Sequence, residues 1–367
     1  MSNIVSAMKS NSRITHRRPA VPNETAIDPA DWSADELANA EDWVFELTPA
    51  DIAEIDAAIS SVEARGLDIM AIGIADFPLP DLDMKLAALK NQLMDGRGVA
   101  LLRGLPVERM GAARTAAAYW GLGLRIGDPV SQNAKGHLLG HVADLVGDDI
   151  RTPSNRGYQT NATMHYHCDS CDVAALLCVR QARSGGMTMV ASSLAIHNEM
   201  VRRRPDLARA LAGNWYRDRR DEVPPEKKPW FVLPVFNYVD GHLVVNWQGQ
   251  YIRSAQRFDD VPKFSDPQKE AMALLTSLAG EFAHGVRLDE GDTLFLHNHV
   301  VMHSRTAFED FDEPERKRHL YRLWLATPGG RPIPDAILER YVGLAPGQRP
   351  SGIVVESTKL STPLTPV

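Results

Sequence analysis

The sequence predicts an α+β protein in which helices flank a core of short β-strands. Apolar residues recur at helical spacing mostly before position 125, whereas short apolar runs separated by glycine turns dominate after position 160. No internal repeat interrupts this order. A chain that places helices first and strands later is typical of a β-sandwich or barrel core with helices packed outside it.

The expected helices have clear start signals or a clear apolar period. Thr48 can cap a helix whose first residue is Pro49, and Asp51 stands three residues after the cap. The predicted helices are residues 49–62, 82–94, 111–122, 193–211 and 266–280. The run Arg202-Arg203-Arg204 is interpreted as the solvated face of the fourth helix rather than an anion site.

The expected strands lie on either side of a long polar loop. Residues 130–158 are rich in Gly, Asn, Asp and His, and a loop of this length is usually functional. Asp240-Gly241 predicts a hairpin turn within residues 231–252. The other predicted strands are residues 98–104, 164–172, 173–179, 293–299 and 318–325, and residues 184–190 are predicted to form a turn followed by a strand.

Composition and charge limit the class of protein. The content of 44% hydrophobic and 24% charged residues is that of a soluble globular protein. A net charge of -7 argues against a nucleic-acid-binding protein, and the absence of a long apolar run argues against a membrane protein. Three cysteines, all between positions 168 and 178, and a polar N-terminus indicate a cytoplasmic location.

The chain is expected to have one main domain with two extensions. Residues 1–40 lack sustained periodicity and predict a partly disordered N-terminal arm. The domain is placed at residues 41–345. Residues 346–367 are rich in Pro, Ser and Thr and are expected to form a C-terminal tail.

The nine residues from Met164 to Asp172 are dense in potential metal ligands. On a strand, His165, His167 and Asp169 would point to the same side, so His167-x-Asp169 offers an imidazole and a carboxylate to one point. Cys168-x-x-Cys171 has the spacing of a zinc knuckle. No second cysteine or histidine pair follows nearby to complete a tetrahedron, so buried thiols are favoured.

A third ligand is available far downstream. His297, His299 and His303 fall within seven residues, and spacing alone leaves all three open. Two histidines and one carboxylate form the facial triad that leaves positions free on Fe(II). Because a metal often lies in the mouth of a jelly roll, the predicted core is a double-stranded β-helix (jelly roll).

Arginines in the last strand indicate an anion site. Arg318, Leu320, Arg322 and Trp324 would share one face of the strand, and two guanidiniums beside apolar groups need an anionic partner. The alternative is an outward face on which the arginines pair with surface acids, namely Glu309, Asp310, Glu313 and Glu315.

Together these motifs resemble the TauD/TfdA family of Fe(II)/2-oxoglutarate-dependent dioxygenases, which includes the clavaminate-synthase-like enzymes. The resemblance covers residues 98–327. The matching motifs, in order, are His167-x-Asp169, Gly185-Gly186-Met187-Thr188, Gly291-Asp292 with Asn298 and His303, and the pair Arg318 and Arg322. Cys168 and Met187 depart from commoner members, and neither position is a ligand in the family.

The resemblance implies roles for these residues. His167, Asp169 and His303 would bind Fe(II), which selects His303 from the three downstream histidines. Thr188 and Arg318 would hold the far carboxylate of 2-oxoglutarate, and Arg322 would contact 2-oxoglutarate or the substrate. O2 would then oxidise an unactivated C–H, with release of succinate and CO2. A carboxylate at position 169, where related halogenases have a small residue, favours hydroxylation.

The substrate is predicted to be small, polar and anionic, such as an amino acid or a related carboxylate. This prediction depends on Arg322 and on polar residues near the expected pocket, namely Gln132, His137, Gln159, Asn161 and His165. Two other functions stay open at this point: a zinc-dependent hydrolase, and a non-catalytic jelly-roll sensor of metal or 2-oxoglutarate. A homo-oligomer also stays open.

Overall fold

Two β-sheets enclose the core of the protein. The computed structural model describes residues 15–146, 157–341, 344–345 and 347–366. In this part of the chain the larger sheet has the order β1-β2-β14-β6-β17-β3, and β4 also pairs with β17. Its strands are β1 Val44–Glu46, β2 Val99–Arg103, β3 Asp128–Pro129, β4 Leu139–Val142, β6 Val173–Arg180, β14 Thr293–His297 and β17 His319–Ala326. All of these pairs are antiparallel except β1 with β2.

The smaller sheet has the order β13-β8-β15-β5 and is antiparallel throughout. Its strands are β5 Met164–His167, β8 Thr188–Ser192, β13 His284–Val286 and β15 Val301–Arg305. Three further pairs are β7 Ser184–Gly185 with β16 Phe308–Glu309, β9 Tyr216–Asp218 with β10 Trp230–Val232, and β11 Phe236–Val239 with β12 His242–Val245. The last pair is the hairpin predicted at Asp240-Gly241. Two sheets joined in this way form the predicted jelly-roll core.

The larger sheet is buried on both faces because its apolar residues alternate between two cores. In β14, Leu294 and Leu296 belong to the core shared with the smaller sheet, whereas Phe295 belongs to the core under the N-terminal helices. Leu176 and Leu177 divide in the same way in β6. Successive side chains of a strand point to opposite faces, so a continuous apolar run is required where both faces are covered.

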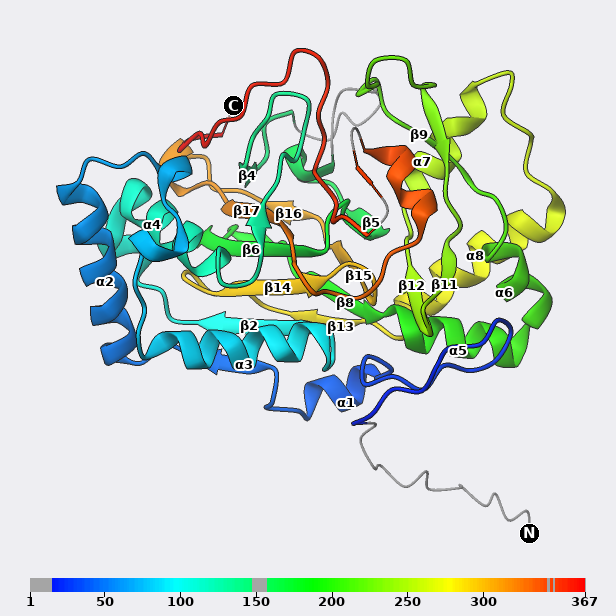
Figure 1. Cartoon of the computed structure of the whole chain (residues 1–367), viewed down its shortest axis with the longest axis horizontal. Helices are drawn as coiled ribbons and strands as arrows, with labels where there is room; N and C mark the ends of the chain where they lie inside the picture. The colour runs from blue at the N-terminus through cyan, green and yellow to red at the C-terminus, as the bar shows by residue number, and fades with distance from the viewer. Residues whose placement is uncertain (1–14, 147–156, 342–343, 346, 367) are drawn as a thin grey trace, which may run out of the picture.

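Helices cover the sheets from two sides. Figure 1 shows α2, α3 and α4 beside the larger sheet, and α5, α6 and α8 at the opposite end of the molecule. The helices are α1 Ala34–Ala38, α2 Pro49–Ala64, α3 Leu82–Met94, α4 Val107–Gly123, α5 Ser193–Arg203, α6 Pro205–Leu211, α7 Gly249–Ser254 and α8 Asp266–Glu281. In the described ranges, none of the helices is both long and apolar enough to cross a lipid bilayer.

The predicted helix 193–211 is two helices. Pro205 lacks a backbone N–H and restricts the residue before it, so Arg204 adopts an extended conformation (φ -148°) and ends α5. The arginines of this junction lie on the surface, as predicted, and pair with acidic residues, namely Glu199, Asp206, Glu270 and Glu281.

The N-terminal segment packs on the core from residue 26 onward. Residues 1–14 of the predicted arm lie outside the described residues. Ala26, Ala30 and Trp32 are buried, and α1 follows them. Asp28 is buried against Arg331, with 2.8 Å between its Oδ2 and Arg331 Nη2. This ion pair ties the segment to the region that follows β17.

The C-terminal segment lies along the long polar loop. The amide of Ile353 donates to the carbonyl of Ser131 (2.8 Å), and the amide of Ser361 donates to the carbonyl of Gly136 (2.9 Å). In Figure 1 this segment, coloured red, runs past β4 and β5. The two chain ends therefore pack against different parts of the core.

Replacing Asp28 with Ala is expected to reduce the free energy of unfolding by about 3–5 kcal/mol, because Arg331 would be left as a buried charge without its carboxylate. Chemical denaturation measures this change. Asp95→Ala is the matched control, since Asp95 is exposed and lies 3.6 Å from Arg17, and its effect should stay below about 1 kcal/mol. Equal effects of the two substitutions would contradict the importance of the buried pair.

Candidate metal centre

Three side chains predicted as ligands meet where β5 and β15 pair. The antiparallel register sets His303 opposite His167, and their ring centroids lie 4.3 Å apart. Strand alternation was expected to carry Asp169 to the same side, but β5 ends at His167. Asp169 lies in the bend that follows, where its amide donates to Asn298 Oδ1 (2.9 Å). A loop contact, not the pleat, therefore positions the carboxylate.

The separations of these side chains suit a divalent metal. His167 Nε2 lies 3.7 Å from Asp169 Oδ1, and His303 Nε2 lies 4.0 Å from Asp169 Oδ2. Two ligands at metal–ligand distances near 2.1 Å can be at most about 4.2 Å apart. Among the described residues this is the one group of three His, Cys, Asp or Glu whose ligand atoms all lie within 4.8 Å.

Hydrogen bonds orient the donor atoms toward the cluster. His167 Nδ1 donates to the carbonyl of His165 (2.9 Å), so its Nε2 carries the lone pair that faces Asp169. The indole Nε1 of Trp324 donates to Asp169 Oδ2 (2.9 Å). Such contacts fix the rotamers of a metal site before the metal arrives.

The charges of the cluster are those of a cation site. Burial acts to raise the pKa of Asp169, but the Arg322 guanidinium, the two histidines and the hydrogen bond from Trp324 together outweigh it and hold that pKa below its ordinary value. Burial lowers the pKa of His303 to about 3, so this imidazole is neutral at physiological pH. An ionised carboxylate and a neutral imidazole are the protonation states that a divalent metal requires.

The other downstream histidines have structural positions. His299 Nε2 lies 2.8 Å from Asp172 Oδ1, and both side chains are fully enclosed. His297 ends β14 and is buried with no exposed surface. Since spacing could not separate the three histidines, the register of β15 against β5 is what singles out His303.

The cysteines pack as buried thiols. Cys168 Sγ lies 3.9 Å from the carbonyls of Val245 and Val301, and Cys171 Sγ accepts from Asn298 Nδ2 (3.2 Å). Burial raises the pKa of Cys168 to about 12 and raises that of Cys171 well above its ordinary value. Thiols held in the protonated form do not make a zinc-thiolate knuckle.

A small cavity joins the cluster to the predicted 2-oxoglutarate residues. Its lining includes His167, Asp169, His303, Thr188, Arg318 and Arg322. Arg318 is buried, and its Nη1 has no hydrogen-bond partner among the residues that the structure describes. A Cβ on Gly186 would lie 2.9 Å from Arg318 Nε, so glycine leaves room for the guanidinium. A buried guanidinium nitrogen without a partner is suited to an anion.

Arg322 faces the cluster rather than the surface. Its Nε donates to Gln132 Oε1 (2.7 Å), and its Nη1 lies 3.4 Å from Asp169 Oδ2. The guanidinium lies between the rings of Tyr158 (4.6 Å) and Trp324 (4.9 Å). The alternative of an outward face paired with surface acids is wrong for both arginines, because Arg322 lies in β17, which is buried along its whole length, and Arg318, just before this strand, is buried as well.

A larger cleft of about 380 Å³ opens on the other side of the cluster. His167, Asp169 and Arg322 line both this cleft and the small cavity. His165 is exposed in the cleft, as predicted, and Gln132 reaches it. A cleft that shares two of the three clustered side chains, His167 and Asp169, with an arginine-lined cavity can admit a second molecule beside the first.

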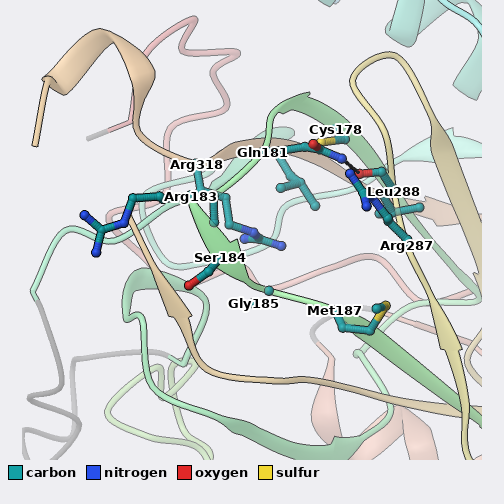
Figure 2. A pocket seen from close by; sticks show the side chains of 12 residues that line it. Cys178, Gln181, Arg183, Ser184, Gly185, Met187, Arg287, Leu288 and Arg318 are labelled. Atoms are coloured by element: carbon teal, nitrogen blue, oxygen red, sulfur yellow. Dashed lines mark hydrogen bonds between the residues drawn. The ribbon is translucent and has the colours of Figure 1, made fainter. Parts of the chain in front are cut away.

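Arg318 also separates the small cavity from a third cavity of about 280 Å³. Figure 2 shows this cavity with Arg318 at one wall and Arg287 at another. Ser184 and Gly185 of β7 and Met187, just before β8, also line it. The Arg318 side chain therefore lines two cavities, one on each side of it.

The remaining residues predicted to contact the substrate lie elsewhere. His137 and Gln159 line a smaller side cavity that touches Arg322 from behind. The backbone carbonyl of Asn161 accepts a hydrogen bond from the backbone amide of Phe308 (3.1 Å), and Asn161 is half-buried. Polar composition near a motif does not fix which way a loop turns, and none of these three residues is in the described lining of the larger cleft.

Two residues that position the Asp169 carboxylate were not predicted from the sequence. The indole of Trp324 and the amide of Asn298 both hold Asp169. Trp324 was recognised only as a member of the arginine-bearing face, and the motif that contains Asn298 gave it no role. Alternation along β17 was the signal that could have predicted the contact of Trp324.

The three thiols are expected to resist alkylation in the native protein, because only the thiolate reacts and burial keeps them protonated. Labelling with iodoacetamide near pH 8, followed by intact mass, should show no adduct when folded and three adducts when unfolded. Rapid modification of one thiol in the folded protein would indicate an activated cysteine and contradict this prediction.

Known proteins share both the fold and the sequence pattern. An asparagine oxygenase solved with Fe(II), hydroxyasparagine and succinate superposes with a TM-score of 0.63 at 18% identity, over 85% of this chain and 99% of that chain. FR-33289 synthase from Streptomyces rubellomurinus is 29% identical over 87% of this chain and 96% of its own length. The taurine hydroxylase-like protein SAT17 from Stachybotrys chartarum is 29% identical over 81% of each chain.

The family model of the taurine catabolism dioxygenase TauD, TfdA family matches residues 62–324. This match confirms the predicted enzyme class, an oxidoreductase that uses Fe(II), 2-oxoglutarate and O2, and it excludes the zinc hydrolase as the leading function. The chain therefore belongs to the TauD/TfdA family of dioxygenases.

Proposed function

We propose that this dioxygenase hydroxylates a small anionic substrate, of the amino-acid or carboxylate type, in the cleft beside the metal cluster. The main support for this proposal is that the small cavity and the larger cleft share part of their lining. His167, Asp169 and Arg322 line both the small arginine-bearing cavity and the larger cleft. A cosubstrate in the first and a substrate in the second would meet at the same metal.

His167, Asp169 and His303 are assigned as the ligands of Fe(II). The fit rests on their separations, on the ionised state of Asp169 and on the oriented Nε2 of His167. When bound, iron with 2-oxoglutarate and O2 supplies the oxidising power that converts a C–H group to C–OH, with succinate and CO2 as coproducts. The protein positions the target carbon and keeps out water.

Arg318 and Thr188 are assigned to the far carboxylate of 2-oxoglutarate. Both are buried in the small cavity, and the open Nη1 of Arg318 can donate to a carboxylate oxygen. Arg322 sits between this cavity and the cleft and already contacts Asp169. Its remaining donors can orient an acidic group of 2-oxoglutarate or of the substrate.

The substrate class is supported by the cleft and by relatives. The cleft volume of about 380 Å³ suits a small molecule, and its walls combine arginine with the aromatic rings of Trp247 and Tyr251. The related asparagine oxygenase was solved with a hydroxylated amino acid, and another relative is described as taurine hydroxylase-like. We further place the enzyme in the reducing cytoplasm, in keeping with its three free thiols.

O2-dependent succinate formation is the direct test of this proposal. The iron-loaded protein is supplied with 2-oxoglutarate and a panel of amino acids, carboxylates and sulfonates, and succinate and hydroxylated product are measured together. A substrate should raise both in equal amounts above the uncoupled background. A panel without any coupled product would contradict the substrate class, and 2-oxoglutarate binding without succinate formation would favour the non-catalytic sensor.

Asp169→Ala is expected to abolish hydroxylation while the fold, measured by circular dichroism, is retained. Trp324→Phe keeps the carboxylate but removes its indole donor, and should lower Fe(II) affinity about tenfold, the lower range for a lost contact to a ligand. Titration with Fe(II) measures the metal affinity of each variant, and a separate assay of product formation measures hydroxylation. Wild-type Fe(II) affinity in both variants would show that Asp169 is not a ligand.

Arg318→Gln is expected to raise the KM for 2-oxoglutarate about 100-fold, because a buried carboxylate would lose its charged partner. Arg316→Gln is the matched control: Arg316 is an exposed arginine two residues away that pairs with Glu313, and its KM should not change. An unchanged KM in the Arg318 variant would mean that the cosubstrate binds elsewhere.

A further inference from the structure

We propose that Gln132 is a positioning residue of the metal centre. It holds the Arg322 guanidinium on one oxygen of the Asp169 carboxylate, so that the other oxygen stays available to Fe(II). The C-terminal segment, residues 351–361, in turn holds the loop that carries Gln132. This segment lies beyond residues 62–324, the part of the chain that the family model matches. The inference rests on the proposed function, since it concerns the Fe(II) ligands assigned there.

The side-chain amide of Gln132 is fully engaged inside the protein. Its Nε2 donates to the backbone carbonyls of Leu138 (2.9 Å) and Arg322 (2.7 Å), and its Oε1 accepts from Arg322 Nε (2.7 Å). Because two carbonyls face the nitrogen and a guanidinium faces the oxygen, the two ends of the amide cannot exchange places. Both N–H groups are used, so Gln132 serves Arg322 and not the substrate.

A glycine makes room for this amide. Gly140 of β4 pairs with Arg322 of β17, and a Cβ at position 140 would lie 2.3 Å from Gln132 Oε1. Glycine is the residue that permits such a close approach to a backbone. A larger side chain at this position would push the amide away from the guanidinium.

Arg322 meets Asp169 at one of its two oxygens. Arg322 Nη1 lies 3.4 Å from Asp169 Oδ2, and the indole of Trp324 donates to the same oxygen (2.9 Å). Asp169 Oδ1 instead lies 3.7 Å from His167 Nε2. An unrestrained guanidinium pairs with both oxygens of a carboxylate through two parallel N–H groups. Since Gln132 occupies Nε, the guanidinium is kept from turning in this way, and Oδ1 remains available to the metal.

Burial makes this restraint necessary. Arg322 and Asp169 are both buried, and opposite charges attract more strongly there than in water. A buried guanidinium nitrogen that loses its acceptor is costly, so it turns to another acceptor within reach. Asp169 is the acid that already lies in ion-pair contact with Arg322. Without Gln132, the guanidinium would therefore compete with Fe(II) for the same carboxylate.

The C-terminal segment holds the loop on both sides of Gln132. Gly352 lies so close to Ser131 that a Cβ on this glycine would be 2.4 Å from the Ser131 carbonyl oxygen. Farther along, the amide of Leu138 donates to the carbonyl of Ser361 (2.8 Å). The chain end that passes β4 in Figure 1 thus reaches the metal centre through a loop and one amide.

Anaerobic calorimetric titration with Fe(II) tests the role of Gln132 in a double-mutant cycle of the wild type, Gln132→Met, Arg322→Gln and the double variant. Met has nearly the length of Gln but lacks the amide. We expect Gln132→Met to weaken Fe(II) binding about 10- to 100-fold in the wild-type background. In the Arg322→Gln background the loss should be less than about twofold, because no guanidinium competes for Asp169. A merely structural role for Gln132 would weaken binding in both backgrounds.

Gln348→Met is the matched control for this substitution. Gln348 is an exposed glutamine whose Oε1 accepts from the amide of Ala345 (2.8 Å), away from the metal cluster. Its variant should bind Fe(II) as the wild type does.

A second pair of variants tests the C-terminal segment and leaves the buried side chains intact. Gly352 has a φ of +79° and Gly347 a φ of +82°, so Ala strains the backbone similarly at both. A Cβ meets Ser131 at Gly352, whereas no described atom lies within 4 Å of a Cβ at Gly347. We expect Gly352→Ala to speed hydrogen exchange at Gln132 and Leu138 in the metal-free protein and to weaken Fe(II) binding about tenfold. Gly347→Ala should do neither.

Four results would overturn the inference. In the cycle they are wild-type Fe(II) affinity in Gln132→Met, or an equal loss in both Arg322 backgrounds. In Gly352→Ala they are unchanged hydrogen exchange, or faster exchange without weaker Fe(II) binding, and this variant decides the question if a buried variant does not fold. A wild-type protein that binds no Fe(II) would instead refute the assigned metal site, so the two failures are distinguishable.

Discussion

The carboxylate of Asp169 is the group on which the arrangement of the site depends. It is buried, so it must be compensated, and it is compensated from three directions. Trp324 donates an indole N–H, Arg322 supplies a charge, and Asn298 holds the backbone of the bend. Because a buried anion without partners is costly, the same contacts that stabilise Asp169 also fix its oxygens toward His167 and His303.

Strand β17 connects this site to the rest of the fold. Its odd-numbered apolar residues, such as Tyr321 and Leu323, pack under the N-terminal helices. Its even-numbered residues face inward, so that Arg322 and Trp324 reach the metal cluster while Arg318, just before the strand, lines the adjoining cavity. One strand buried on both faces thus supplies core packing on one side and charge on the other.

Sequence reasoning predicted what is local or alternates, and missed what depends on loops. The cap at Thr48 and the inward face of β17 follow from short-range rules, and the structure confirms both. Spacing could not choose His303, because that choice is made by the register between β5 and β15. The position of Asp169 was attributed to strand alternation, whereas a hydrogen bond across 129 residues sets it. His137 lines a side cavity next to Arg322, and composition could not predict this because a polar loop can turn either way.

The central claim is that the cluster and the arginine-lined cavity act together on one metal and one 2-oxoglutarate. Anaerobic titration of Fe(II) into the protein with 2-oxoglutarate present measures this directly, through the visible charge-transfer absorption of an iron–2-oxo-acid chelate. We expect a band that saturates at one Fe(II) and one 2-oxoglutarate per chain and that is absent when 2-oxoglutarate is omitted. Absence of the band, with tight stoichiometric zinc binding instead, would contradict it.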